Sequence, residues 1–511
     1  MKSKHFHLSA NRHRYARGQL IVLMTLGLIA LIGVGGIAVD IGYFYSARRQ
    51  MQTAADAAAI AGINAQLGSQ GGNYQQAAID VASLNGFTNG QNGVTVTVGP
   101  PTTPPNPTSN TYVEVDIAQA EPTTFLSVVG YSTMNVSVRA VAGITAGSSC
   151  VYVLDHSAPA ALSLNGNFTV NASCGILVDS SSSTALSAVG NGSVTANAIG
   201  VAGNYSATGN VNLTPTPHIG IAPVGDPLVS RQPPAVPSCT QQSVTGSGSY
   251  TVSGNNQVVT VPPGVYGKGI SITGNSAVVT FAAGTYGNNI SIGGNTSRAT
   301  FSPGQYQNGG SGDSIDISGN ATIVFNSGQY TFCGGLSITG NNNVTLSPGL
   351  YSGGISITGN ATIAFNPGVY ILAGGGLNVT GNSTLTGTGV TFYNTTGPGG
   401  YQPINLAGNE TAQFSAPTTG PLEGILIFQD RAIGYSSSNG SVVVGNSSSI
   451  FDGIVYFPTT AVTYVGNSSS SGYTILVADK ITITGNASAR FGDNYSSLAD
   501  GSPIKSTTLY E

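Results

Sequence analysis

The sequence contains no tryptophan and very little charge. Only 7% of its 511 residues are Asp, Glu, Lys or Arg, against ~25% in ordinary globular domains. A formal net charge of −4 leaves no basic surface for nucleic acid, so we expect no nucleic-acid partner. Disorder is also excluded, because 40% of the residues are apolar and they recur in periodic patterns.

Groups that perform acid–base or nucleophilic chemistry are scarce as well. No histidine follows His218, and in the second half of the chain only Asp313 and Asp316 are carboxylates close together in sequence. Carbohydrate lyases and hydrolases need paired carboxylates, or a carboxylate with Arg and Lys, on neighbouring strands. The Asp430–Arg431 neighbours are more simply an exposed ion pair. We therefore expect no enzymatic activity and no cofactor.

Cysteine occurs four times, at Cys150, Cys174, Cys239 and Cys333. No CxxC pair is present, so a zinc site has little support. We expect disulfides between Cys150 and Cys174 and between Cys239 and Cys333, because these pairs are closest along the chain. Four buried free thiols remain the alternative.

Two segments come close to known metal-binding patterns. "GGSGDSIDIS" (Gly309 to Ser318) approaches a calcium-binding β-helix repeat, but Asp313 comes one residue early and the pattern occurs once. "VYVLDHSAPA" (Val151 to Ala160) approaches the start of a von Willebrand A domain, with Pro159 in place of the second Ser. We expect Asp155 to cap a turn, and we expect no metal site.

One long apolar run is present, from Leu20 to Val39, and it could cross ~30 Å of hydrocarbon as a helix. An excess of Lys and Arg precedes it, which predicts a cytoplasmic N-terminus with residues 1–17 as a basic tail. A cleaved signal peptide is the alternative, but its apolar region is usually shorter and ends in an A-x-A-like site. The helix formers that follow, up to Leu67, predict that the membrane helix continues outward.

The segment "RGQLIVLMTLGLIALIGVGGIAVDIGYFYSARRQMQTAADAAAIAGI" (Arg17 to Ile63) resembles the N-terminal domain of TadG-like proteins. These are bacterial envelope proteins associated with Flp (tight-adherence) pilus assembly. The matching features are Gly18, the apolar run, the Ala38-Val39-Asp40 exit, Tyr45, Arg49 and the Ala-rich segment after Thr53. Further on, "ALSLNGN", "TGTGVTFYNTTG" and "GILIFQDR" resemble the C-terminal parts of many TadG-like proteins.

Residues 68–148 predict a small α+β domain. Gln75 to Leu84 and Pro122 to Val129 have helical character. Alternation predicts three strands, at Val94 to Val98, Thr111 to Ile117 and Met134 to Ile144. No functional motif is recognisable in this domain.

Residues 149–492 repeat one short pattern, in which an apolar–polar alternation is followed by a Gly-Asn turn. Most intervals between these turns are 19 to 25 residues, which is typical of a solenoid. Ile355 and Ile357 share one face of such a unit, and a second turn at Pro367-Gly368 leads to a third strand. We predict a parallel β-helix of ~20-residue coils, interrupted by a Pro-rich excursion at 213–240 and followed by a C-terminal tail at 493–511. A leucine-rich repeat would need regular Leu, and a propeller blade ~40–45 residues.

Stacked coils bring equivalent residues together, so the turn asparagines should form a hydrogen-bonded ladder. The ladder candidates are Asn275, Asn295, Asn320, Asn341, Asn360 and Asn382. Tyrosines also recur after the Pro-Gly-like turns, and they should form either a buried aromatic stack, which we favour, or an exposed stripe. These are Tyr266, Tyr286, Tyr306, Tyr330, Tyr351 and Tyr370.

The fold class is therefore mainly β: a parallel β-helix preceded by a single transmembrane helix and a small α+β domain. The resemblance implies a non-enzymatic protein of the bacterial cytoplasmic membrane that acts in Flp/Tad-type pilus assembly or surface attachment. Its partners would be the membrane and pilus-assembly proteins. The alternatives are a β-helix adhesin that binds surface polysaccharide and, less favoured, a carbohydrate lyase or hydrolase.

Overall fold

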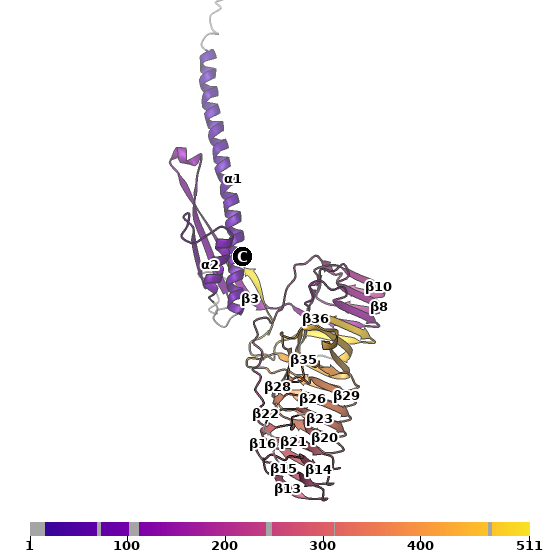
Figure 1. Ribbon diagram of the computed structural model, residues 1–511. Coiled ribbons are helices and arrows are strands. Elements are labelled where there is room, and N and C mark those ends of the chain that lie inside the picture. The colour runs from indigo at the N-terminus through magenta and orange to yellow at the C-terminus, as the bar shows by residue number, and fades with distance from the viewer. Residues whose placement is uncertain are drawn as a thin grey trace, which may run out of the picture. The chain divides into compact units, whose positions relative to one another are not determined.

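The computed structural model describes residues 16–68, 73–101, 112–241, 248–310, 312–468 and 473–510. The chain forms two compact units, one from Met1–Thr145 with Lys505–Glu511 and one from Ala146–Ile504. We call them the helix unit and the solenoid unit and describe each by itself (Figure 1). Residues 1–15 of the predicted basic tail lie outside the described residues.

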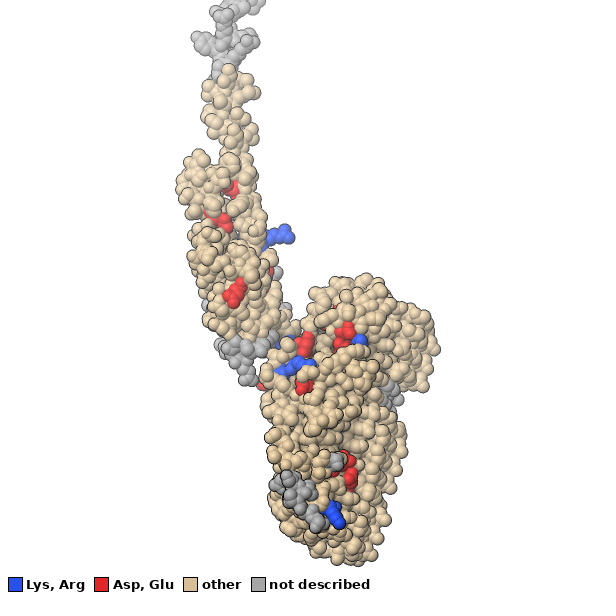
Figure 2. All heavy atoms as spheres, viewed as in Figure 1, with Lys and Arg blue, Asp and Glu red and all other residues tan. Residues whose placement is uncertain are grey.

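Helix α1 (Ala16–Gly68) is continuous, as expected for a membrane helix that extends outward. It is the one helix among the described residues that is long and apolar enough to cross a membrane, and its most apolar stretch of 18 residues has a mean hydropathy of 2.6. From Leu20 to Tyr45 most of its large apolar side chains are exposed, and its upper part in Figure 2 carries only uncharged atoms on the side shown. Beyond Met51 one face of the helix is buried, through Ala54, Ala55, Ala58, Ala59 and Ile63.

The small domain packs on this buried face of α1. Its elements are α2 (Tyr74–Leu84), β1 (Thr95–Gly99), β2 (Tyr112–Pro122), the 3-10 helix η1 (Leu126–Val129), β3 (Thr133–Ala146) and β38 (Lys505–Tyr510). Strands β2 and β3 form an antiparallel hairpin from Tyr112↔Gly143 to Pro122↔Thr133. The predicted helix from Pro122 to Val129 is therefore wrong at its start. Hairpin pairing extends to Pro122 and leaves only one 3-10 turn at the tip.

The C-terminal residues belong to the same sheet, whose strand order is β1-β2-β3-β38. The ring of Tyr510 packs 5.1 Å from the ring of Tyr112, and both lie over Gly143, where an added Cβ would overlap them. Within the predicted C-terminal tail at 493–511, residues 505–510 thus form a strand that completes the sheet of the helix unit. The sequence alone could not show that the strand next to β3 would come from the end of the chain.

The solenoid unit is a parallel β-helix of about 14 turns, which confirms the predicted fold class. Each coil contributes strands to three faces. The first face contains β12 (Tyr250–Val252), β14 (Ile270–Ile272), β17 (Ile290–Ile292), β20 (Asp313–Ile317), β23 (Gly335–Gly340), β26 (Ile355–Gly359), β29 (Leu377–Gly381) and β32 (Asn405–Leu406). The second contains β13 (Val258–Val261), β15 (Val278–Phe281), β18 (Arg298–Phe301), β21 (Thr322–Phe325), β24 (Asn343–Leu346), β27 (Thr362–Phe365), β30 (Thr384–Thr388) and β33 (Thr411–Ser415).

The third face contains β16 (Gly284–Tyr286), β19 (Gly304–Tyr306), β22 (Tyr330–Phe332), β25 (Gly349–Tyr351), β28 (Gly368–Ala373), β31 (Val390–Thr395) and β34 (Ile425–Gln429). After η2 (Ser437–Asn439), the longer strands β35 (Ser441–Ser468), β36 (Tyr473–Gly485) and β37 (Ser488–Asp493) run around more than one face. Equivalent residues stack in register, for example Ile270 on Ile290 and Ile338 on Ile357. This stacking explains the repetition in the sequence, because each coil is the template for the next.

The order of coils in the stack differs from their order in the chain. Strand β36 pairs in parallel with β4 and β5, so the last coils stack directly on the first ones. From this junction the first coils continue outward to β10 and β11, and the coils from β12 onward occupy the opposite end (Figure 1). The first coils are β4 (Ser149–Val153), β5 (Leu162–Gly166), β6 (Thr169–Ala172), β7 (Gly175–Val178), β8 (Leu186–Thr195), β9 (Ala198–Val201), β10 (Tyr205–Thr214) and β11 (His218–Ile219).

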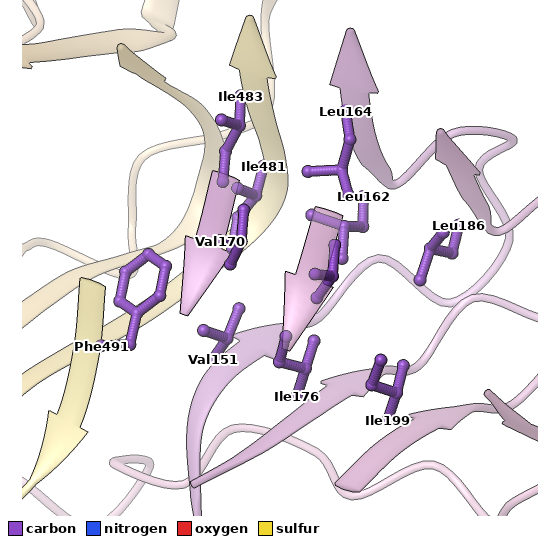
Figure 3. Close-up of a pocket in the computed structure, with 11 residues that line it drawn as sticks. Val151, Leu162, Leu164, Val170, Ile176, Leu186, Ile199, Ile481, Ile483 and Phe491 are labelled. Carbon is purple, nitrogen blue, oxygen red and sulfur yellow. The ribbon is translucent and has the colours of Figure 1, made fainter. Parts of the chain in front are cut away.

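The junction is closely packed. Ile481, Ile483 and Phe491 from the end of the chain point toward Val151 and Leu162 from its beginning (Figure 3). The gap among these apolar side chains is about 10 Å³, room for at most one water molecule. The disulfide Cys150–Cys174, with Cα atoms 5.7 Å apart, joins two coils beside this junction.

The Pro-rich excursion is the segment that returns the chain from one end of the stack to the other. We call the residues that follow β11, 220–241, the return segment. Asp179 accepts hydrogen bonds from the N–H groups of Val224 and Gly225, both 3.0 Å. Further along, Cys239 is bonded to Cys333, with Cα atoms 5.6 Å apart, and Gln241 donates to Asn308. The segment thus passes one coil after another on its way to β12.

The entry and exit of the solenoid unit lie together. The N–H of Gly147 donates to the carbonyl of Ile504 at 2.9 Å, and β3 and β38 are neighbours in the other unit's sheet. The solenoid is therefore an insertion into the sheet of the helix unit. The permuted stack and its return segment bring both ends of this long insertion to one place.

The Cys239–Cys333 disulfide should matter more to stability than Cys150–Cys174. It closes 94 residues, which in the chain-entropy account is worth about 4–5 kcal/mol. The other closes 24 residues, worth about 3–4 kcal/mol on the same account. We expect Cys239→Ser/Cys333→Ser to lower the urea midpoint of the solenoid more than Cys150→Ser/Cys174→Ser. The reverse order would contradict the conclusion that the disulfide of the return segment contributes more to the stability of the solenoid.

Candidate functional site

The tyrosines of the Pro-Gly turns form a buried stack. Tyr286, Tyr306, Tyr330, Tyr351 and Tyr370 are almost fully buried, and only Tyr266 is partly exposed. Ring centroids lie 5.2 Å apart from Tyr286 to Tyr306, 6.0 Å from Tyr306 to Tyr330 and 5.9 Å from Tyr351 to Tyr370. Between Tyr330 and Tyr351 the stack is completed by the ring of Phe332, at 5.9 and 4.6 Å. Each hydroxyl donates to the carbonyl four residues earlier, as from Tyr351 to Ser347 at 2.7 Å. Burial raises the pKa of these buried phenols, and their rings are not available as a glycan-binding stripe.

The turn asparagines take part in hydrogen bonds between coils in two ways. The side-chain amide of Asn360 donates to the side-chain oxygen of Asn341, and that of Asn382 donates to Asn360, both at 3.3 Å. At Asn275 and Asn295 the backbone N–H donates to the Asn side chain of the preceding coil. Asn320 accepts at its backbone carbonyl from Thr296. Across the junction, Asn167 donates to Asn486 at 2.9 Å, so the row continues where the chain order is broken.

A polar cleft of about 490 Å³ lies beside the junction of the first and last coils. It is lined by residues of the first coils (Leu154, Asp155, His156, Ser157), the return segment (Gly225, Asp226) and the last coils (Arg431, Pro458, Thr459, Asp479). In a chain with so few charged residues, four of these ten lining side chains are carboxylates or guanidinium. The cleft is therefore the strongest candidate for a polar binding site.

Arg431 forms one wall of the cleft and is fully engaged. It lies 3.2 Å from the carboxylate of Asp226 and donates to the carbonyls of Leu228 and Arg231. Its guanidinium also lies over the rings of Phe428 and Tyr456. The predicted ion pair with Asp430 is wrong, since successive residues at a strand end point apart. Asp430 instead accepts from Thr395 and from the N–H of Ala432.

Asp155 caps a turn, as the sequence suggested, by accepting from the N–H groups of Ser157 and Ala158. Lys480 lies 3.4 Å from the same carboxylate and over the ring of Tyr435. Burial acts to raise the pKa of Asp155, but the two N–H donors and Lys480 outweigh it and the pKa is lowered. Burial, followed by the charge of Asp155, raises the pKa of neighbouring Asp479.

Asp313 and Asp316 form a second carboxylate pair, on β20 at the first face. Asn289 donates to Asp316 at 2.7 Å. Burial, and then the nearby charge of Asp316, raise the pKa of Asp313. In the part of the chain that the structure describes, no three His, Cys, Asp or Glu side chains come together as a metal site. The pair has the composition of a weak cation or proton site, without a third ligand of those types.

In the helix unit, Asp40 fixes the tip of the β2–β3 hairpin to α1. Its carboxylate accepts from the N–H groups of Thr124, Phe125 and Leu126, at 3.1, 2.9 and 2.7 Å. One turn earlier, a methyl group on Gly36 would overlap the ring of Phe125. One turn later, Tyr43 donates to Glu121 at 3.3 Å. Three positions on one helix face thus hold a single loop.

This geometry lies inside a recognised domain. Residues 18–67 match the family model of TadE/G-like Flp pilus-assembly proteins. The match confirms the resemblance seen at Arg17 to Ile63 and places α1 in the context of the Flp/Tad pilus. It ends before the small domain, so the resemblance of the later segments to TadG-like proteins stays a prediction. No curated protein and no solved structure matches the chain.

Sequence reasoning missed the cleft, because its walls come from residues more than 300 positions apart. Asp155 and Lys480 meet only because β36 pairs with β4, and Asp226 arrives with the return segment. The scarcity of charge was the one available signal, since each charged residue in a solenoid of Ser, Thr, Asn and Gly calls for an explanation. Asp40 was visible within the family motif, but its partners at 124–126 were not.

The raised pKa of Asp313 makes a testable contribution to pH dependence. When the pKa of a carboxyl is higher in the folded protein than in the unfolded chain, ~3.9, the free energy of unfolding falls as pH rises through the folded pKa. Asp316→Asn removes the neighbouring charge while keeping an acceptor for Asn289. We therefore expect the variant to gain stability relative to the parent between pH 4 and neutral pH, measured by urea midpoints. A difference that is constant with pH would contradict the coupling of the two carboxyls.

Proposed function

We propose that this protein is a membrane-anchored, non-enzymatic component of an Flp/Tad-type pilus system. The observation that carries the proposal is the TadE/G-like match at residues 18–67, which covers nearly all of α1, including its exposed apolar half. Exposed side chains such as Leu23, Leu31 and Val34 would be stable in hydrocarbon and unfavourable in water. The solenoid unit would then be the surface that the anchor carries outside the membrane.

Several features of the solenoid support a role as scaffold rather than catalyst. Arg431, Asp226 and Asp179 are engaged with backbone groups of the return segment, where they act as structural fasteners. Asp155 is committed to a turn. Catalysis instead needs acid or base groups free to contact substrate, with a pKa suited to proton transfer. The buried tyrosine stack stiffens the rod without exposing reactive groups.

A second candidate function is the binding of a polysaccharide, and the cleft favours it. About 490 Å³ of open space bounded by Asp155, His156 and Asp479 would accommodate one or two sugar units through hydrogen bonds. The tyrosine stripe considered from the sequence does not contribute, because its rings are buried. Binding without turnover would make the protein an adhesin.

The topology can be tested with thiol labelling, because the four cysteines are all in disulfides. With the N-terminus in the cytoplasm, Ser3→Cys should react with a membrane-impermeant maleimide only after the cells are permeabilised. Leu84→Cys, at a position 85% exposed at the end of α2, should react in intact cells. Labelling of Ser3→Cys in intact cells, or a mature N-terminus after Val39, would refute an uncleaved anchor of this orientation.

The function is tested by deleting the gene and by assaying the purified chain. Loss of pili or of surface attachment, restored by the wild-type gene, is expected; normal piliation in the deletion strain would refute the pilus role. The chain should not degrade pectins, alginate, glucans or peptidoglycan, with or without calcium. Turnover that Asp313→Ala or Asp430→Ala abolishes would show an enzyme. Saturable glycan binding that His156→Ala weakens would favour the adhesin.

A further inference from the structure

The tip of the β2–β3 hairpin carries an unusual concentration of exposed apolar side chains. Beyond Tyr45, the helix unit exposes seven large apolar side chains among its described residues, and all but Leu84 and Leu509 lie between Phe125 and Met134. Val128, Val129 and Tyr131 are 84%, 67% and 69% exposed. From Pro122 to Val138 the chain contains no charged residue. We call residues 123–134 the apolar tip.

The apolar tip is held at a defined level along α1. Phe125 packs on Gly36, and Asp40 accepts three N–H groups from residues 124–126. The uncharged run ends at Val39, and its 20 residues are ~30 Å long as a helix, the thickness of the hydrocarbon core. Gly36, three residues before Val39, therefore lies ~5 Å inside the outer edge of the hydrocarbon. A loop in contact with Gly36 cannot stay clear of the lipid around that helix.

The polar groups near the apolar tip are compatible with a location at the edge of the hydrocarbon. Asp40 is 3% exposed and its carboxylate accepts three N–H hydrogen bonds, so its charge is stabilised by hydrogen bonds at the hydrocarbon edge. Leu126 turns inward onto the cluster that contains Phe44, while the next apolar residues turn outward. Tyr43 and Tyr45 of α1 and Tyr131 of the tip are all exposed aromatic residues near this level, the composition of an interfacial belt.

We infer that the apolar tip inserts into the outer leaflet of the bilayer as a second membrane contact beside α1. The occupant of this surface is lipid, because the surface continues directly from the exposed apolar face of the membrane helix. This inference rests on the proposed membrane anchoring. Two contacts would fix the rotation and tilt of the helix unit relative to the membrane, which a single helix cannot do. Asp40 is the residue that positions the tip.

The absence of tryptophan makes a direct test possible, since any introduced Trp is the only one in the chain. The full chain is reconstituted in phosphatidylcholine vesicles with or without brominated acyl chains, which quench Trp fluorescence on contact. Val128→Trp and Tyr131→Trp report on the tip, and Leu28→Trp reports on the membrane helix. Leu84→Trp is the matched control, because α2 contacts Gly62 through Ala78, ~33 Å along α1 from Asp40. Leu84 is only ~9 Å further along α2 than Ala78, so it stays well away from the level of Asp40.

We expect Val128→Trp and Tyr131→Trp to be quenched at least half as strongly as Leu28→Trp, and Leu84→Trp not at all. Adding Asp40→Ala should reduce quenching of the Val128→Trp variant several-fold and leave that of Leu28→Trp unchanged, which separates positioning by Asp40 from general unfolding. If both tip variants behave like Leu84→Trp while Leu28→Trp is quenched, the tip does not contact lipid. The inference is then wrong, while membrane anchoring by α1 is still supported. Blue-shifted emission without bromine quenching would mean that protein covers the tip, which also overturns it. If Leu28→Trp is not quenched, membrane anchoring fails, and the inference fails with it.

Discussion

Backbone pairing between successive coils is the interaction on which the solenoid depends. A single coil of ~20 residues has almost no interior and cannot bury its apolar side chains, so each coil is stable only on a neighbour with the same register. This requirement favours similar residues at inward-facing stacked positions, such as the isoleucines at 270, 290 and 315. It also explains the low charge, because like charges stacked ~4.8 Å apart would repel one another in every coil.

The same requirement does not dictate that coils stack in chain order. A coil needs a matching neighbour, and residues 149–178 match the coil at 473–493 as well as they match their own successor. The permuted stack brings both ends of the insertion together and leaves the return segment to cross the outside of the coils. A segment on the outside has no ladder of its own. Side chains must hold it, and here they are Asp179, Arg431 and the Cys239–Cys333 disulfide.

The contrast between repeated coils and contacts made by single distant segments explains what could be predicted from the sequence. Periodicity predicted the β-helix and the apolar helix, because stacking and membrane crossing impose composition on many residues at once. It predicted neither the permutation nor the strand at 505–510, because both depend on which distant segments meet. The helix expected at Pro122 to Val129 was wrong for a similar reason. Its residues are fixed by a hairpin partner and by Asp40, over 80 positions earlier, rather than by local propensity.

Scarce charged residues in this chain act mainly as fasteners between segments distant in sequence. Arg431 joins the return segment to the last coils, Lys480 joins the last coils to the first, and Asp40 joins a hairpin tip to a helix. Most of these charges have several hydrogen-bonding partners. Removing one partner would leave part of the hydrogen-bonding capacity of a largely buried group unsatisfied, which is costly. In a surface of Ser, Thr, Asn and Gly, such fasteners are also the features that distinguish one coil from another. Without them the repeated coils would offer many nearly equivalent registers, and a unique permuted order would have little to specify it.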